Sequence, residues 1–287
     1  MKNVVFLLAC FIIFSCKSRK TENVAVNDSN LLDLFSYKDN VKPIVSVHRG
    51  GKGIKNYPEN CLETIMYIND SISAIYEIDI AKTKDGKLVL MHDDNLDRTS
   101  TGSGKLTSYT YKALKQFNLV DDYGHETTFK IPLFKDVLIW AKTNHVILTI
   151  DVKKSVNVKD IVAIIRETKA ENVSIIITYN LKQARLAYKI APELMLSVSA
   201  RNEEELDWLV HSKIPTKNMI AFTGTRLSSK SFYQKVHQYG IKCMLGTLGN
   251  LDKKAKVKGD MLYKTWTDMG VDIIATDRPF EAAASLK

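Results

Sequence analysis

The sequence predicts an α/β fold in which helices pack around a parallel β-sheet, and three observations lead to this prediction. From residue 43 onward, short runs rich in β-branched residues alternate with longer segments of helical periodicity, as in repeated βαβ units. The runs are nearly continuously apolar, which is expected of strands buried on both faces of a parallel sheet. The length of 287 residues also suits an α/β barrel, which often forms one domain of about 250 residues.

Nine runs are candidates for strands, whereas an eight-stranded barrel has one position fewer. One run must therefore lie outside the barrel. The weakest candidates are Met195–Val198 and Met219–Phe222. The nine runs are Ile44–His48, Ile75–Ile80, Leu88–Met91, Val146–Val152, Val173–Thr178, Met195–Val198, Met219–Phe222, Ile241–Leu245 and Asp272–Ala275.

Helical periodicity is clearest in three segments between these runs, which are Ile161–Lys169, Leu181–Ile190 and Glu203–Val210. Pro192 lies just beyond the second segment, where a proline ends a helix. The stretch over residues 94–130 is too long for an ordinary connection between a strand and a helix. We expect it to be an insertion that caps one end of the barrel.

The composition excludes several classes of protein. With 45% hydrophobic and 25% charged residues, the chain has the material for a large core and is not a disordered protein. The net charge of +9 favours anionic partners, but no nucleic-acid-binding motif accompanies it and no protein partner is indicated. A phosphate-bearing substrate or an anionic membrane surface fits better. Cys61 and Cys243 are too few for a disulfide framework, and we expect both to be buried thiols.

The N-terminus has the features of an export signal. Lys2 is followed by Val4–Phe14, about eleven apolar residues, where a membrane-spanning helix needs about 20. This stretch leads into Ser15 and Cys16, which resemble a bacterial lipoprotein signal in which the cysteine is lipidated and becomes the new N-terminus. A cleaved signal without a lipid is the alternative.

These features divide the chain into three parts. Residues 1–16 are expected to be a lipoprotein-type signal peptide, residues 17–40 a flexible tether, and residues 41–287 the folded domain. We therefore expect an exported bacterial lipoprotein, periplasmic or at the cell surface, that is attached to the membrane through Cys16.

Acidic side chains occur within and at the ends of the strand candidates, where the reactive groups of parallel barrels lie. Glu77 and Asp79 are two residues apart on one strand and therefore point to the same side. Asp151, two strand candidates further along, can bring a third carboxylate to the same rim. Hard divalent cations prefer carboxylate oxygens, so we predict a metal site. Ion pairs with Lys153 or Arg49 are the alternative.

Two histidines also follow apolar runs. His48 and His92 are expected at the mouth of the barrel, where imidazoles can take up and release protons near neutral pH. Arg49 and Lys153 are suited to binding a phosphate group, and the arginine can do so through bidentate hydrogen bonds. Together these residues indicate acid–base chemistry on a phosphate-bearing substrate.

The residues around these positions resemble the glycerophosphodiester phosphodiesterase family. Single blocks are weak evidence, but the whole set occurs in the family's order. The blocks are His48-Arg49-Gly50, Pro58-Glu59-Asn60, Glu77-Ile78-Asp79, His92-Asp93, Leu96-Asp97-Arg98-Thr99, Ile131-Pro132-Leu133, Asp151-Val152-Lys153, Gly270-Val271-Asp272 and Thr276-Asp277-Arg278-Pro279.

The resemblance implies a (β/α)8 TIM barrel with an insertion after the third strand. It implies hydrolysis of glycerophosphodiesters to an alcohol and glycerol 3-phosphate, with a divalent cation, Ca²⁺ or Mg²⁺. By position, Glu77, Asp79 and Asp151 would hold the metal.

The resemblance also implies roles for five further residues. His48 and His92 would be the catalytic acid–base pair, without an indication of which is the acid. Arg49 and Lys153 would bind the substrate phosphate, and Glu59 would lie near the metal or the substrate.

Three departures from the family pattern bear on the site. Asp151 stands where glutamate is usual and is one methylene shorter, and Cys61 stands where threonine is common, which we interpret as a packing change. Residues 246–250 replace a block with a tryptophan, so we expect a more open pocket and weaker specificity for glycerol. Two alternative functions remain: a phospholipase D-like enzyme that releases a cyclic phosphate, and a non-catalytic lipoprotein that binds phosphodiesters.

Overall fold

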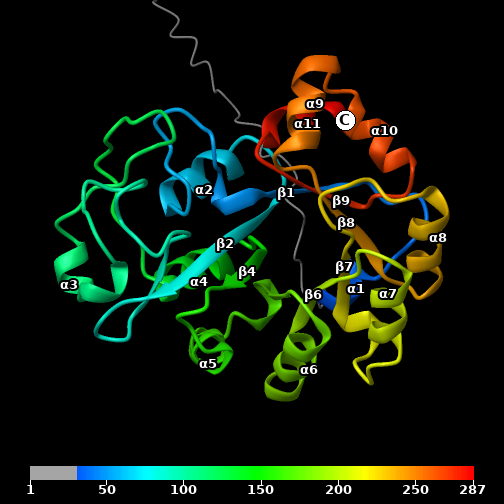
Figure 1. Ribbon diagram of the computed structural model, residues 1–287, viewed down its shortest axis with the longest axis horizontal. Coiled ribbons are helices and arrows are strands. Elements are labelled where there is room, and N and C mark those ends of the chain that lie inside the picture. The colour runs from blue at the N-terminus through cyan, green and yellow to red at the C-terminus, as the bar shows by residue number, and fades with distance from the viewer. Residues whose placement is uncertain (1–30) are drawn as a thin grey trace, which may run out of the picture.

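The computed structural model describes residues 31–287. Within these residues, eight parallel strands close into a barrel in the order β1-β9-β8-β7-β6-β5-β4-β2, and pairing of β1 with β2 completes the circle (Figure 1). The strands are β1 (Ile44–Val47), β2 (Ile75–Lys82), β4 (Leu148–Val152), β5 (Ser174–Thr178), β6 (Met195–Ser199), β7 (Met219–Phe222), β8 (Lys242–Gly246) and β9 (Ile273–Thr276). This confirms the predicted (β/α)8 barrel.

The strand that lies outside the barrel is β3 (Leu88–Leu90), which pairs antiparallel with the far end of β2. We had expected one of Met195–Val198 and Met219–Phe222 to be peripheral, and this was wrong, because these runs form β6 and β7. The connection over residues 83–87 explains the difference. Parallel neighbours need a crossover of about a dozen residues or more, whereas a connection this short produces a hairpin.

Helices cover the outside of the barrel. The helix α5 begins at Val158, earlier than predicted, because the Asn157 side chain accepts a hydrogen bond from the backbone N–H of Lys159 and caps the first turn. The outer helices are α2 (Leu62–Asn69), α4 (Phe134–Thr143), α5 (Val158–Thr168), α6 (Leu181–Ile190), α7 (Glu203–Val210), α8 (Lys230–Gln238), α9 (Asn250–Lys258), α10 (Leu262–Asp268) and α11 (Pro279–Ser285). None of the helices in residues 31–287 has both the length and the apolar character needed to cross a bilayer.

Side chains inside the barrel change from apolar to polar along the strands. On β2, Ile75, Glu77 and Asp79 alternate with Tyr76 and Ile78, and these two residues pack against the outer helices. The end where the strands begin is filled by one apolar layer, and the carboxylates lie toward the other end. At or directly before the starts of the strands, this layer contains Ile44, Ile75, Ile147, Ile175, Met195, Ile220 and Ile273.

A short helix closes the end of the barrel where the strands begin. In α1 (Leu31–Phe35), both Leu31 and Phe35 are buried against the apolar layer. The next segment is fixed as well, because the ring of Tyr37 stacks on His237 with 3.7 Å between ring centroids. The start of the described chain is therefore held at the end of the barrel opposite the carboxylates.

This helix corrects part of the predicted domain organisation. Residues 31–40 were assigned to a flexible tether but belong to the folded domain, because two apolar side chains one helical turn apart fill the open end of the barrel. The predicted signal peptide (residues 1–16), the lipidated Cys16 and the rest of the tether (residues 17–30) lie outside the described residues.

The insertion after β3 forms a small lobe with its own core, at the left of Figure 1. It contains the 3₁₀ turn η2 (Leu106–Ser108) and the helix α3 (Tyr111–Leu114). Cys61 is buried in the same core, which confirms that it is a packed thiol. The other buried side chains of the lobe core are Ala81, Val89, Met91, Leu96, Leu106, Leu114, Leu119 and Ile131.

Candidate active site

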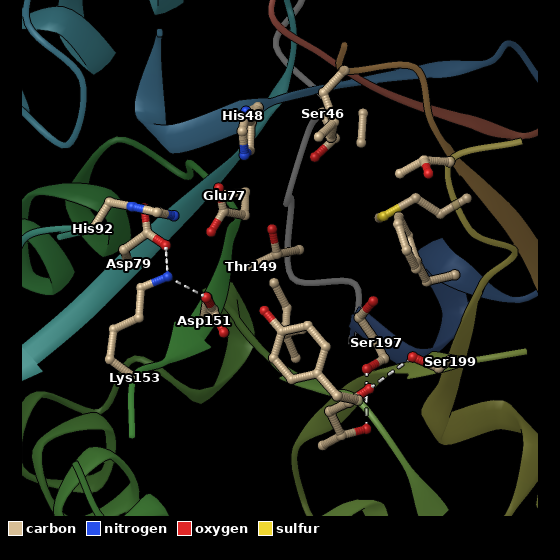
Figure 2. Close-up of a pocket in the computed structure, with 18 residues that line it drawn as sticks. Ser46, His48, Glu77, Asp79, His92, Thr149, Asp151, Lys153, Ser197 and Ser199 are labelled. Atoms are coloured by element: carbon tan, nitrogen blue, oxygen red, sulfur yellow. Dashed lines mark hydrogen bonds and ion pairs between the residues drawn. The ribbon is translucent and has the colours of Figure 1, made fainter. Parts of the chain in front are cut away.

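Three carboxylates gather toward the end of the barrel where the strands finish (Figure 2). The strands β2 and β4 are direct neighbours, and their register pairs Asp79 with Asp151. Glu77 lies on the same side of β2, and oxygens of the three side chains lie within 4.8 Å of one another. Asp151 was expected two strands away. It is closer than predicted because β3 does not take a place in the barrel.

These carboxylates fit a hard divalent cation. Asp151 Oδ1 is buried and has no hydrogen-bond partner among the described residues, so it is free to act as a ligand. Burial and the neighbouring Asp79 raise the pKa of Glu77 well above its ordinary value, which reflects the excess of negative charge. A cluster of carboxylate oxygens is the ligand set that Ca²⁺ and Mg²⁺ prefer.

Lys153 lies against the same group. Its Nζ atom is 2.6 Å from Asp79 Oδ1 and 2.8 Å from Asp151 Oδ2. Burial works against the charge of Lys153, but the two carboxylates outweigh it and raise the pKa of this lysine. Burial also works against ionisation of Asp79, yet Lys153 and the amide of Asn60 lower its pKa. The ion pair named as the alternative to a metal is therefore present, and it leaves Asp151 Oδ1 unoccupied by any partner in the described chain.

His48 and Arg49 follow β1 in the 3₁₀ turn η1 (His48–Gly50). The Nδ1 atom of His48 lies 2.6 Å from Oδ1 of Asp277, which follows β9. Arg49 has a φ of 51°, which is uncommon for a residue other than glycine. Its backbone N–H donates to Glu77 Oε2 at 2.8 Å, so this backbone conformation ties the end of β1 to the carboxylate group.

His92 reaches the site through the antiparallel strand. Because β3 runs back along β2, the backbone N–H of Met91 donates to the carbonyl of Asp79, and His92 follows directly. Its Nδ1 atom lies 2.6 Å from Asp93 Oδ1, and its Nε2 atom lies 2.6 Å from Nη2 of Arg49. A guanidinium group only donates, so Nε2 accepts and the ring proton is on Nδ1, facing Asp93.

Glu59 binds two arginines. Its side chain is buried, and Arg49 Nη1 donates to both of its oxygens at 3.0 and 3.2 Å. Arg98 approaches from the insertion lobe and donates to the same oxygens at 2.7 and 3.1 Å. Glu59 was expected near the metal or the substrate. It lies behind Arg49, and neither residue is among those that line the cavity.

A cavity of about 230 Å³ opens between these groups and the far wall of the barrel. The aromatic ring of Phe222 lies against Gly246, where an added Cβ atom would be only 3.1 Å from it. Residues 246–250 lack the expected tryptophan, but Phe222 supplies aromatic surface to the same wall. The side chains of the far wall are uncharged and include Ser46, Ser197, Ser199, Phe222, Thr225, Met244 and Leu248.

Five site residues were not assigned a role from the sequence. Asn60 exchanges two hydrogen bonds with Asp79, at 2.7 and 2.9 Å, and Tyr179 lies near Asp151, which together with burial raises the pKa of its hydroxyl. Four of the five, all except Tyr179, lie in the blocks quoted for the family, and that position was the available signal. The five are Asn60, Asp93, Arg98, Tyr179 and Asp277.

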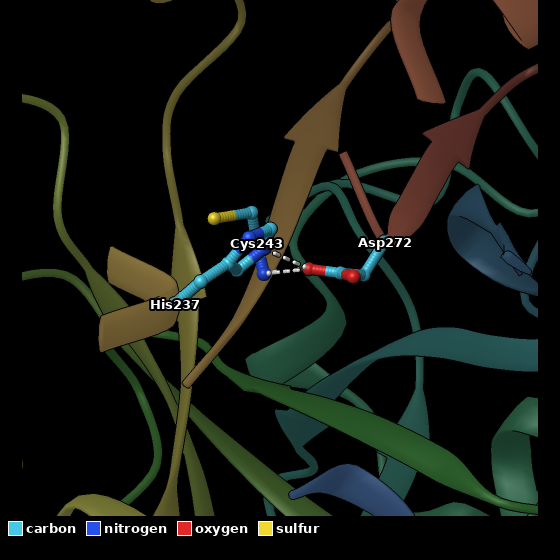
Figure 3. A group of neighbouring side chains, drawn as sticks. All are labelled: His237, Cys243 and Asp272. Carbon is cyan, nitrogen blue, oxygen red and sulfur yellow. Dashed lines mark hydrogen bonds and ion pairs between the residues drawn. The ribbon is translucent and has the colours of Figure 1, made fainter. Parts of the chain in front are cut away.

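A second group of possible metal ligands lies at the opposite end of the barrel (Figure 3). Asp272 Oδ2 accepts hydrogen bonds from His237 Nε2 at 2.8 Å and from the backbone N–H of Cys243 at 2.7 Å. The sulfur of Cys243 points away from Asp272, and burial raises the pKa of the thiol, whereas a metal ligand must be a thiolate. This group fastens α8 to β8 and β9, and Cys243 is a buried thiol, as expected.

Several known proteins are similar to this chain. A crystal structure of a glycerophosphoryl diester phosphodiesterase from Parabacteroides distasonis has a TM-score of 0.84 and 33% identity, covering 90% of this chain and 92% of that chain. A glycerophosphodiester phosphodiesterase of Bacillus altitudinis is 26% identical over 252 residues, which are 83% of this chain and 96% of the relative. The chain spans 65% of an uncharacterized Bacillus subtilis protein, with 29% identity over 165 residues.

A more distant structure shares the fold. The Oleispira antarctica phosphodiesterase, solved with the product sn-glycerol-3-phosphate, has a TM-score of 0.66 at 18% identity and covers 85% of this chain and 96% of that chain. The family model described as "Glycerophosphoryl diester phosphodiesterase family" matches residues 48–281. This match begins at His48 and extends past Asp277, so it includes every ionisable residue of the candidate site. The chain therefore belongs to the glycerophosphoryl diester phosphodiesterase family.

Proposed function

We propose that this protein hydrolyses glycerophosphodiesters to an alcohol and glycerol 3-phosphate with the help of a divalent cation, Ca²⁺ or Mg²⁺. The observation that carries the proposal is the meeting of two histidine–aspartate pairs and three carboxylates beside one cavity. The Parabacteroides and Bacillus altitudinis relatives are described as glycerophosphodiester phosphodiesterases, and the Oleispira enzyme was solved with sn-glycerol-3-phosphate; both support the choice of substrate.

The charged residues of the site form two sets, one that would bind a cation and one that would bind the substrate phosphate. Glu77, Asp79 and Asp151 would hold the cation, which when bound would polarise the phosphodiester. Lys153 and Arg49 would donate hydrogen bonds to the phosphate oxygens and stabilise the negative charge that develops there. Binding of a cation to the carboxylates would free the Lys153 ammonium for this role.

The hydrogen bonds of the two histidines suggest different roles. His92 presents its unprotonated Nε2 to Arg49, so when Arg49 turns to the phosphate this nitrogen becomes available as the base that activates water. Nδ1 of His48 is held by Asp277, and its other ring nitrogen has no partner among the described residues. With a proton on that nitrogen, His48 would donate to the departing alkoxide, and Asp277 would stabilise the imidazolium.

The proposed activity is tested with a panel of glycerophosphodiesters and a metal titration. We expect glycerophosphocholine and glycerophosphoethanolamine to release glycerol 3-phosphate. EDTA should abolish turnover, and Ca²⁺ or Mg²⁺ should restore it. Phosphorus NMR identifies the product: a persistent cyclic phosphate would favour the phospholipase D-like alternative. Binding without turnover under every metal condition would favour a non-catalytic lipoprotein.

We also propose that the chain is exported and anchored to a membrane through lipidated Cys16, which lies outside the described residues. The sequence of the apolar stretch and of Ser15-Cys16 supports this proposal. Metabolic labelling with palmitate should mark the protein, and Cys16→Ser should remove both the label and sedimentation with membranes. Label that persists in this variant would exclude Cys16 as the anchor.

A further inference from the structure

Five side chains form a closed ring of hydrogen bonds beside the cavity, and one of them comes from the insertion lobe. Arg98 donates to Asp93 at 2.6 and 3.0 Å and to Glu59 at 2.7 and 3.1 Å. Asp93 binds His92, Glu59 binds Arg49, and Arg49 binds His92, which closes the ring. We propose that Arg98 is a positioning residue that aligns both His92 and Arg49. This inference rests on the proposed function, which assigns those two residues to catalysis and phosphate binding.

Arg98 makes a pair of hydrogen bonds to each of two acids, and these acids hold different residues of the site. Through Asp93, Arg98 sets the orientation of the His92 ring, because Asp93 accepts the Nδ1 proton. The hydrogen bond from Arg98 is the main reason that the pKa of Asp93 is lowered, so Asp93 stays ionised and keeps accepting that proton. Arg98 therefore supports the tautomer in which His92 Nε2 is unprotonated.

Through Glu59, Arg98 controls how firmly Arg49 is held. The Glu59 side chain is only 2% exposed and carries a negative charge that needs compensation. With Arg98 present, two guanidinium groups share this charge. Without it, Arg49 would be the principal cation at Glu59 and would be drawn away from the phosphate and from His92. Loss of Arg98 should thus disturb both branches of the ring.

The lobe holds Arg98 from both sides. Leu96 is buried in the lobe core, and Thr99 is also buried and donates through Oγ1 to the sulfur of Met91 at 3.3 Å. The backbone N–H of Val120 donates to the carbonyl of Thr99 at 2.9 Å. The lobe core thereby fixes the backbone that carries Arg98, which gives the insertion a function in the site.

Arg98→Ala tests this role by steady-state kinetics on glycerophosphocholine with saturating cation. Loss of an outer positioning contact of this kind typically lowers activity about 10- to 100-fold, and we expect a fall of this size in kcat. Arg98→Lys should not restore activity, because one ammonium group cannot make two planar forks. Arg166→Ala is the matched control: Arg166, on α5, forms an exposed pair with Glu193, and its loss should leave kcat and KM unchanged.

Two further measurements separate alignment from folding. Added guanidinium should partly restore the activity of Arg98→Ala, because the Arg98 side chain is 40% exposed and its place is accessible from solvent. In a double-mutant cycle with Asp93→Asn, the combined loss should be much smaller than the product of the single losses, because both changes break the same branch. Thermal melting identifies a variant that fails to fold. If Arg98→Ala does so, Arg98→Lys takes its place in the cycle.

The outcomes distinguish this inference from the proposed function. A wild-type protein without turnover would refute the proposed function. An active wild type with an equally active Arg98→Ala variant, or with fully multiplicative losses in the cycle, would overturn only the role of Arg98.

Discussion

The two histidine–aspartate pairs of the cavity are built in different ways. His48 and Asp277 follow β1 and β9, neighbouring strands whose register pairs Val47 with Thr276, so the backbone of the barrel sets their spacing. His92 and Asp93 are consecutive residues that follow an antiparallel strand, and Arg98 of the lobe holds Asp93 in place. The barrel pair thus depends on the common fold, whereas the lobe pair depends on a local insertion.

This difference suggests how the site can vary without loss of the fold. A change in the lobe should alter the lobe pair and Arg49 while the barrel pair and the carboxylates stay in place. A change in the barrel core should affect stability before it affects either pair. The predictions below test this separation.

The largest effect is expected from removing the imidazoles themselves. His48→Ala and His92→Ala should each lower kcat by about 10²- to 10⁴-fold, because each removes a proton-transfer group. Circular dichroism should show an unchanged fold for both. Near-normal turnover in either variant would exclude that histidine from the mechanism, and the two histidine–aspartate pairs could then no longer be compared as catalytic pairs.

A smaller effect is expected from the aspartate partners. Asp277→Asn and Asp93→Asn should each lower kcat about 10- to 100-fold, because a neutral amide no longer favours the required tautomer. The Asp277 change should be the more damaging of the two, since the His92 ring keeps a second contact with Arg49, whereas the His48 ring has no second hydrogen-bond partner among residues 31–287. Equal losses in kcat would contradict the proposed difference between the pairs.

Cation binding should depend on pH through the carboxylates that lie between the pairs. Burial and the neighbouring Asp79 raise the pKa of Glu77, and a cation binds only the ionised form. Affinity should therefore fall as pH is lowered below this raised pKa, by at most about tenfold per pH unit for one proton displaced. Calorimetry in buffers of different ionisation enthalpy measures the proton released. Glu77→Gln should weaken binding and remove this proton, and an unchanged release would assign it to another group.

The smallest effect on activity is expected from a matched pair of core substitutions. Leu96→Ala in the lobe and Leu245→Ala on β8 each remove a fully buried leucine, and each should destabilise the protein by about 2–5 kcal/mol. Only Leu96→Ala should also lower kcat, by severalfold, because Leu96 lies two residues from Arg98. Urea unfolding and kinetics on the same samples check this. A lower kcat in the Leu245 variant would argue against the separation of barrel and lobe.

Much of the fold could be predicted from local sequence. The apolar runs coincided with strands, and the periodicity of Leu181–Ile190 and Glu203–Val210 matched the helices α6 and α7. The direction of a strand and the strand with which it pairs could not be predicted from local sequence. The Leu88–Leu90 strand is as apolar as a barrel strand, and only its short connection to β2 makes it antiparallel. The α1 helix was not predicted because its apolar residues are buried only by contact with the barrel layer, which is formed by residues distant in the sequence.

In the site, too, local features could be predicted from the sequence, whereas contacts between distant residues could not. Residue types and strand positions brought together the carboxylates, His48, His92 and Lys153, all of which line the cavity. Contacts between distant side chains were not visible in the spacing. Asp277 is far from His48 in the sequence, and the double use of Glu59 by Arg49 and Arg98 depends on how the lobe folds back.

The α1 helix has a consequence for the movement of small molecules. Leu31 and Phe35 fix the start of the described chain at the end of the barrel opposite the cavity. Any attachment made through the preceding residues would thus hold the enzyme by its closed end. Substrate arrival and product departure would take place at the other end of the domain. The point of attachment would then stay out of the path of diesters that enter and leave the cavity.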